Sequence, residues 1–137
     1  MALPHTSRVY ENWAPVLGRV LFGGLFLMGA AFKIPGTSGY AMESAMTAAA
    51  GLPYASIFVA LAFVLEVVAG VSLIIGWHAR IAAFVLAIFT LALAIIFYSN
   101  FSNPQIMGEF ISHLGLIAGL LYISVYGARY AAVKRDR

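Results

Sequence analysis

The sequence predicts an all-α fold: a four-transmembrane-helix antiparallel bundle with a short interfacial helix between the first two spans. Of its 137 residues, 63% are hydrophobic and only 9% are charged, whereas soluble domains average roughly 45–50% apolar and about 25% charged residues. The apolar residues also gather into four runs, each near the roughly 20 residues that a helix needs to cross a bilayer. These runs are 14–32, 54–75, 81–98 and 110–126.

The four spans and their connections use the chain from end to end, so we expect a single integral membrane domain over residues 1–137. The net charge of +3 indicates contact with anionic lipid and not nucleic-acid binding, because the basic residues flank the spans. One side carries Arg8, Arg80, Arg129, Lys134, Arg135 and Arg137, and the other carries Lys33. The positive-inside rule then predicts that both termini are cytoplasmic.

The first span predicts a protein-facing stripe. At 3.6 residues per turn, small or charged residues recur along one face of the helix. They are Arg19, Gly23, Phe26, Ala30 and Lys33. A cleaved signal peptide is disfavoured for this segment, because Arg19 interrupts the apolar run that such a peptide needs.

The segment after the first span is too long for a turn and too weakly apolar to cross the membrane. Its core, residues 40–50, ends at Gly51 and Pro53, which are helix-stop signals, so we expect a short helix on the membrane surface. The connection 76–80 is so short that the second and third spans must be antiparallel neighbours. Small or polar residues of the third span should face the other helices: Ala83, Ala87, Thr90, Ala94 and Tyr98.

Glu66 is the residue that most needs an explanation, because it lies near the middle of the second span. A charge at the centre of a spanning helix costs roughly 2.5–3.5 kcal/mol, so it needs a partner. If Lys33 and Tyr54 share the outer interface, the helical rise puts Arg19 and Glu66 at similar depth. We therefore predict a buried Arg19–Glu66 pair, which either only fixes helix register or also contacts a proton or a quinone-like headgroup.

A second candidate site lies at the outer face, where Lys33, Tyr98, Glu109 and His113 should gather. There, His113 could exchange protons or hydrogen-bond a quinone oxygen. Gly115 and Gly119 form a G-x-x-x-G pair that suits close packing, and a homo-oligomer is one alternative. Cysteine is absent, and no metal site or catalytic motif is expected.

Short stretches in order along the chain resemble the DoxX family of small four-helix bacterial inner-membrane proteins. The resemblance runs from about Pro15 to Gly127. It is carried by residues 19–33 (RVLFGGLFLMGAAFK), 65–70 (LEVVAG), 74–80 (IIGWHAR) and 97–101 (FYSNF). It implies a multi-pass protein of the bacterial inner membrane. For some members it implies redox chemistry, in a quinone-linked thiosulfate oxidoreductase of archaea and in an oxidoreductase complex of mycobacteria.

Our first functional hypothesis is a membrane subunit of a quinone-linked redox system, without a covalently bound cofactor and with a soluble or membrane oxidoreductase as partner. The quinone-like molecule would lie near Arg19 and Glu66, or near Tyr98 and His113. The alternative is a non-catalytic structural or assembly subunit of a larger membrane complex, and the residues leave open whether the protein is an enzyme. A carrier is disfavoured, because one span holds the central acid and no inverted repeat is evident.

Overall fold

The computed structural model describes residues 5–129 and 131–133, and over them the chain is helical, without strands. Its five helices are α1 (His5–Ala31), α2 (Ser38–Ala49), α3 (Ala55–Ile75), α4 (Ala79–Tyr98) and α5 (Pro104–Tyr126). Four of them are long and apolar enough to cross a membrane: α1 from Arg8, α3, α4 and α5. The predicted fold class, including the short helix between the first two spans, is confirmed.

Two helices, α1 and α5, begin well before the apolar runs from which they were predicted. α5 begins at Pro104 because the side chain of Asn103 accepts a hydrogen bond from the Gln105 backbone N–H at 2.9 Å, and proline suits the first helical position. α1 begins at His5 and continues through Pro15, so polar residues before the first span extend the helix. Apolarity therefore marks the membrane-crossing part of a helix and not its ends.

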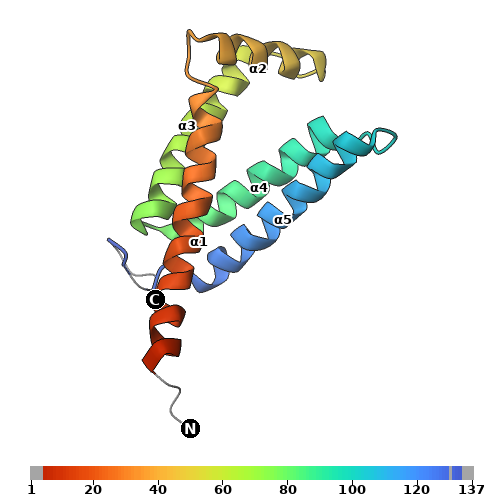
Figure 1. The fold of residues 1–137 in the computed structure, drawn as a ribbon. Coiled ribbons are helices and arrows are strands. Elements are labelled where there is room, and N and C mark those ends of the chain that lie inside the picture. The colour runs from red at the N-terminus through yellow and green to blue at the C-terminus, as the bar shows by residue number, and fades with distance from the viewer. Residues whose placement is uncertain (1–4, 130, 134–137) are drawn as a thin grey trace.

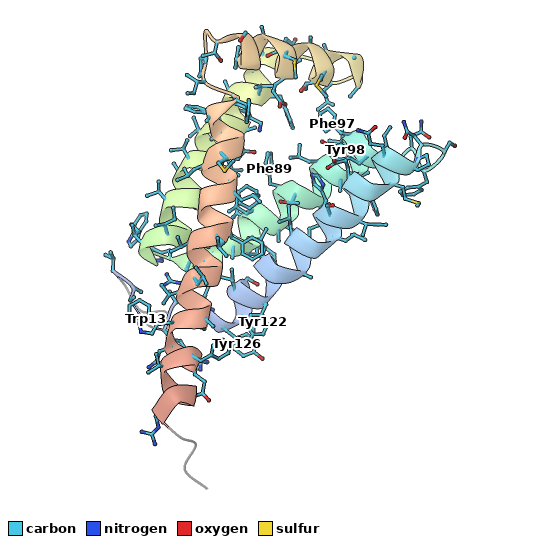
Figure 2. The ribbon with its side chains drawn as sticks, in the orientation of Figure 1. Trp13, Phe89, Phe97, Tyr98, Tyr122 and Tyr126 are labelled. Carbon is cyan, nitrogen blue, oxygen red and sulfur yellow. The ribbon has the colours of Figure 1, made fainter. Side chains whose placement is uncertain are left out.

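The spans are arranged as two antiparallel pairs, α1 with α3 and α4 with α5 (Figure 1). The pairs meet near the α3–α4 turn and diverge toward the opposite end, where α2 lies across α3. We call these the turn end and the α2 end. Five of the aromatic side chains labelled in Figure 2 lie toward the two ends, with Trp13, Tyr122 and Tyr126 at the turn end and Phe97 and Tyr98 at the α2 end, while Phe89 lies between them. That distribution is typical of the two interfaces of a membrane protein.

All four spans contribute to one core near the turn end. Its buried members include Phe26 of α1, Leu73 of α3, Leu86 of α4 and Leu120 of α5. The stripes predicted for the first and third spans are buried as expected, from Arg19 to Ala30 and from Ala83 to Ala94. Side-chain periodicity therefore identified the packed faces correctly.

Glycines bring the backbones of α1 and α3 into contact. A Cβ on Gly23 would lie 2.6 Å from the carbonyl oxygen of Gly70, and a Cβ on Gly70 would lie 3.0 Å from the carbonyl oxygen of Gly23. Because only glycine permits this approach, the contact fixes how far α3 is shifted along α1. This shift determines which charged residues meet.

Candidate functional site

Glu66 pairs with Lys33 and not with Arg19, so the predicted Arg19–Glu66 pair is wrong. The Lys33 ammonium lies 3.2 Å from Oε2 of Glu66. The Arg19 guanidinium instead reaches the Leu73 carbonyl, seven residues farther along α3. Seven residues of helix correspond to a rise of about 10 Å.

The Gly23–Gly70 contact explains the error. With Gly23 beside Gly70, Arg19 lies one turn closer to the turn end and therefore opposite the last turn of α3, beyond Glu66. The predicted pairing of Arg19 with Glu66 depends on Lys33 and Tyr54 lying at one depth in the membrane. In the structure α3 continues past Lys33 toward the α2 end, which brings the lysine within reach of Glu66.

The Lys33–Glu66 pair is packed against Gly29 of α1. Glu66 is 3% exposed, and its carboxyl lies against Gly29, where a Cβ would be 3.4 Å from Oε2. Lys33 donates a hydrogen bond to the Gly29 carbonyl at 3.2 Å. Its ammonium makes an ion contact with Glu66 Oε2 without the alignment of a hydrogen bond. This packing suits a pair that holds α1 to α3.

Arg19 joins three segments at the turn end. Although only 1% exposed, it donates from one terminal nitrogen to the Leu73 carbonyl at 3.2 Å and from the other to the Ala131 carbonyl at 3.1 Å. The carbonyls in the last turn of a helix lack partners within the helix, and a nearby cation is favourable there. Arg19 therefore stabilises the end of α3 and fixes the segment that follows α5.

Gly76 makes room for this arrangement. It is the C-cap of α3 with φ 71°, a conformation that favours glycine. A Cβ at this position would also collide with the Arg19 guanidinium. The turn glycine that helped carry the family resemblance thus has a structural role beside the buried arginine.

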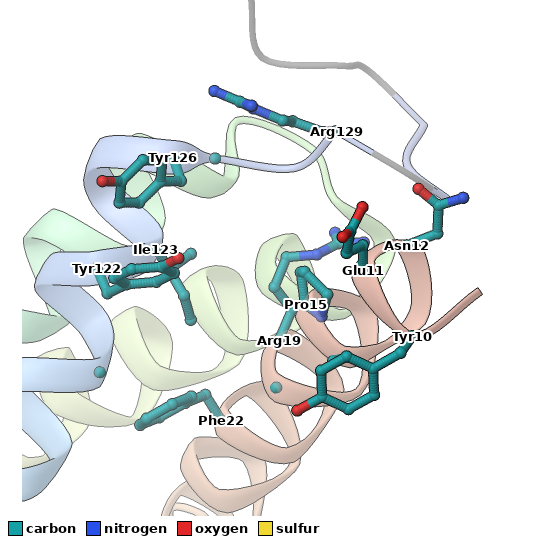
Figure 3. Close-up of a pocket in the computed structure, with 14 residues that line it drawn as sticks. Tyr10, Glu11, Asn12, Pro15, Arg19, Phe22, Tyr122, Ile123, Tyr126 and Arg129 are labelled. Carbon is teal, nitrogen blue, oxygen red and sulfur yellow. The ribbon is translucent and has the colours of Figure 1, made fainter. Parts of the chain in front are cut away.

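A cavity of about 900 Å³ lies between the turn ends of α1 and α5, with Arg19 in its wall (Figure 3). Most of its surface is apolar or aromatic, and a few polar groups interrupt it. Its lining includes Tyr10, Gly18, Arg19 and Phe22 from the α1 side, and Gly119, Tyr122, Tyr126 and Arg129 from the α5 side. Sequence reasoning placed Arg19 at a candidate site but missed the other walls.

Aromatic rings form the α5 wall of this cavity. The rings of Tyr122 and Tyr126, one turn apart on α5, have centroids 4.4 Å apart. The Arg129 guanidinium carbon lies 5.9 Å from the centroid of Tyr126, within the distance of a cation–π interaction. Across the cavity, the Phe22 ring touches α5 at Gly119, where a side chain would collide with it. The spacing of Gly119, Tyr122 and Tyr126 along one helix face was the available sequence signal.

Comparison with known proteins identifies the family. The DoxX family model matches residues 14–99, which is more than half of the chain. The chain belongs to the DoxX family. No curated protein and no solved structure matches it.

Only the α1 wall of the cavity of this DoxX protein contains residues that the family model matches. Arg19, Phe22, Lys33 and Glu66 lie within residues 14–99, whereas the α5 wall lies outside the matched range. The Lys33–Glu66 pair and the Arg19–Leu73 contact therefore lie within the family segment, whereas Ala131, the other partner of Arg19, lies beyond it. The tyrosines opposite them come from the part of the chain beyond it.

The structure divides the residues of the predicted outer-face site between the two helix pairs. Tyr98 and His113 come together across α4 and α5, with ring centroids 4.7 Å apart. His113 Nδ1 lies 2.8 Å from the Glu109 backbone carbonyl oxygen. Lys33, in contrast, lies with Glu66 beside α1 and α3. Within the described residues, no three histidine, aspartate or glutamate side chains gather as a metal site would require.

A smaller cavity of about 380 Å³ lies between α3 and α4 near their turn. Its walls are almost entirely apolar, and Trp77 and His78 stand at its edge. Glu66 lines neither of the two cavities described here, whereas Arg19 lines the larger one. The two residues that the sequence assigned to one site therefore belong to different environments.

Proposed function

We propose that this DoxX-family protein is a membrane subunit of a quinone-linked redox system and that the cavity beside Arg19 receives the quinone headgroup. The observation that carries the proposal is the cavity itself. Its volume of about 900 Å³ is near the upper end of the roughly 300–1,000 Å³ typical of small-molecule sites. Its mixture of aromatic walls with few polar groups is also typical of such sites.

The chemistry of a quinone fits these walls. A quinone offers a flat ring, carbonyl oxygens at the ring edge and an apolar tail. The rings of Phe22, Tyr122 and Tyr126 suit the flat ring. Arg19 also lines the cavity. Its charge is buried, with the terminal nitrogens on the Leu73 and Ala131 carbonyls, and it favours nearby carbonyl oxygens and any negative charge that develops on them.

The position along the membrane also supports the proposal. In our proposed topology the turn end faces the cytoplasm of a bacterial cell, because Arg8 in the first turn of α1, Arg80 in the first turn of α4 and Arg129 after α5 lie there. A headgroup beside Arg19 would then lie near the cytoplasmic interface. A soluble oxidoreductase could exchange electrons with it there, while the tail stays in the bilayer.

A structural or assembly subunit is the second candidate function. It is favoured by the Lys33–Glu66 pair, which packs against Gly29 and lines neither described cavity. On this interpretation, both buried charged sites hold helices together and the ligand of the complex lies on another subunit. A stoichiometric protein partner without bound quinone would favour this candidate.

The test is quinone retention after purification in mild detergent, with solvent extraction and chromatography. Gly18 lines the cavity, and a Cβ there would meet no atom within 4 Å, so Gly18→Leu fills the cavity without a clash at Cβ. Gly24 is equally open but lies outside the residues that line the cavity, so Gly24→Leu is the matched control. We expect about one quinone per chain in wild type and in Gly24→Leu, and little in Gly18→Leu. Quinone absent from wild type, or equally retained by all three proteins, would contradict the proposal.

A further inference from the structure

The α5 wall of the cavity is a row of three planar groups in contact, in which the rings of Tyr122 and Tyr126 are tilted by 39° to each other. Tyr126 has Arg129 on one side and Tyr122 on the other, with the distances given above. Both tyrosines keep much of their surface open: Tyr122 is 63% exposed and Tyr126 48% exposed. Figure 3 shows Tyr122 between Tyr126 and Phe22, so its second face is turned toward the cavity.

We propose that the open face of Tyr122 is the platform on which the ligand ring stacks, and that the ligand is a planar, electron-poor ring. This inference rests on the proposed function and specifies how the headgroup is held. A tyrosine ring carries negative charge on its face. A quinone ring is depleted of electrons by its carbonyl groups, so its face is attracted to that of Tyr122.

The other two groups of this row support Tyr122 from behind. Tyr126 packs against it from the next turn of α5, and the Arg129 cation covers Tyr126. Tyr122 therefore presents its free face in a defined orientation. A platform that is fixed before the ligand arrives loses less side-chain entropy on binding.

The α1 side completes the site. Phe22 lies across the cavity from the platform and rests on α5 at Gly119, one helical turn from Tyr122. Arg19 lies one turn from Phe22 on α1 and lines the same cavity. A ring on Tyr122 would therefore have an aromatic neighbour on its far side and the buried charge of Arg19 in the opposite wall. Flatness of the ligand then matters as much as its carbonyl oxygens.

The experiment measures binding of menadione, a quinone without a tail, to the full-length protein in lipid nanodiscs by equilibrium dialysis. Tyr122→Phe keeps the aromatic face, whereas Tyr122→Leu removes it. Phe110 is an aromatic residue of α5 that packs against Phe101 outside the residues that line the cavity, so Phe110→Leu is the control. We expect Tyr122→Phe and Phe110→Leu to bind within about twofold of wild type. Tyr122→Leu should bind menadione about tenfold more weakly, because one aromatic stacking contact changes the affinity by roughly that factor.

A saturated diketone of similar size tests the requirement for a flat ring. It should bind wild type weakly, and Tyr122→Leu should lower its affinity little. Equal menadione binding by wild type and Tyr122→Leu would overturn the platform and leave the proposed function standing. No binding by wild type, together with no quinone retained on purification, would overturn both. Circular dichroism of each variant shows whether its helices are intact.

Discussion

The Lys33–Glu66 pair predicts how substitutions change the free energy of unfolding, because Lys33 contacts Glu66 whereas Arg19 binds the Leu73 carbonyl. Removing one partner of a buried ion pair costs roughly 3–5 kcal/mol, since the remaining charge is left without compensation. We expect Lys33→Met to lower the free energy of unfolding by about that amount. Glu66→Gln should cost less, because Lys33 lies near the end of α1 with a 13% exposed side chain and can extend toward the interface.

A double-mutant cycle then separates the two possible partners of Glu66. Residues in contact show coupling energies of roughly 0.5–3 kcal/mol, whereas residues more than about 7–10 Å apart are additive within roughly 0.5 kcal/mol. We expect a coupling of about 2 kcal/mol between Lys33→Met and Glu66→Gln. The coupling between Arg19→Met and Glu66→Gln should stay within about 0.5 kcal/mol of zero.

The assay is reversible unfolding of the purified protein in mixed detergent micelles as the fraction of sodium dodecyl sulfate rises, followed by circular dichroism. Both cycles share Glu66→Gln, so any general effect of that substitution cancels. A larger coupling for Arg19 than for Lys33 would refute the assignment of the pair. It would also refute the shift between α1 and α3 from which the pairing follows.

Three further predictions concern the close contacts. Gly119→Ala places a methyl group against the Phe22 ring. The ring should move into the cavity, so dialysis should show menadione binding weakened severalfold. The unfolding midpoint should stay near that of wild type, because alanine favours the helix. Gly23→Val places its side chain against the Gly70 carbonyl, so unfolding in detergent should show a free energy of unfolding lower by roughly 1–3 kcal/mol. A variant as stable as wild type would show that α1 and α3 are farther apart. Arg19→Lys keeps the charge but cannot span the Leu73 and Ala131 carbonyls with a fork, so the same assay should show a loss of roughly 1–3 kcal/mol, and no loss would contradict the bridging role.

The sequence was sufficient for the elements and their packed faces. Long apolar runs marked the four spans, and the 3.6-residue period identified the buried stripes of α1 and α4, because both signals depend on local composition. Helix ends were less accurate, since a cap such as Asn103 can start a helix in polar sequence. Local patterns therefore predicted local structure.

The pairing of Glu66 could not be predicted in the same way, because it depends on the shift between two helices. Depth counted from the span ends required an assumption about where each span meets the interface. The Gly23–Gly70 contact sets that shift, and many small residues in both spans offered alternative contacts of the same kind. The lysine at the end of α1 was named as a candidate in the sequence, but at a different site.

The cavity was missed for a related reason. Its walls come from residues 10–22 of α1 and from the last turns of α5 with the segment that follows, which are far apart in the sequence. Tyr122 and Tyr126 are ordinary interfacial residues when only composition is considered. Their role becomes visible once Phe22 and Arg19 are seen on the opposite wall.

The most direct test of the account is photolabelling of the protein in native membranes with a quinone that carries a photoreactive group on its ring, followed by mass spectrometry of the peptides. We expect labels on the two walls of the cavity, within residues 10–22 and 119–129, and their loss when unlabelled quinone is added in excess. Labels concentrated around Tyr98 and His113, or spread along the lipid-facing surface and insensitive to competitor, would contradict it.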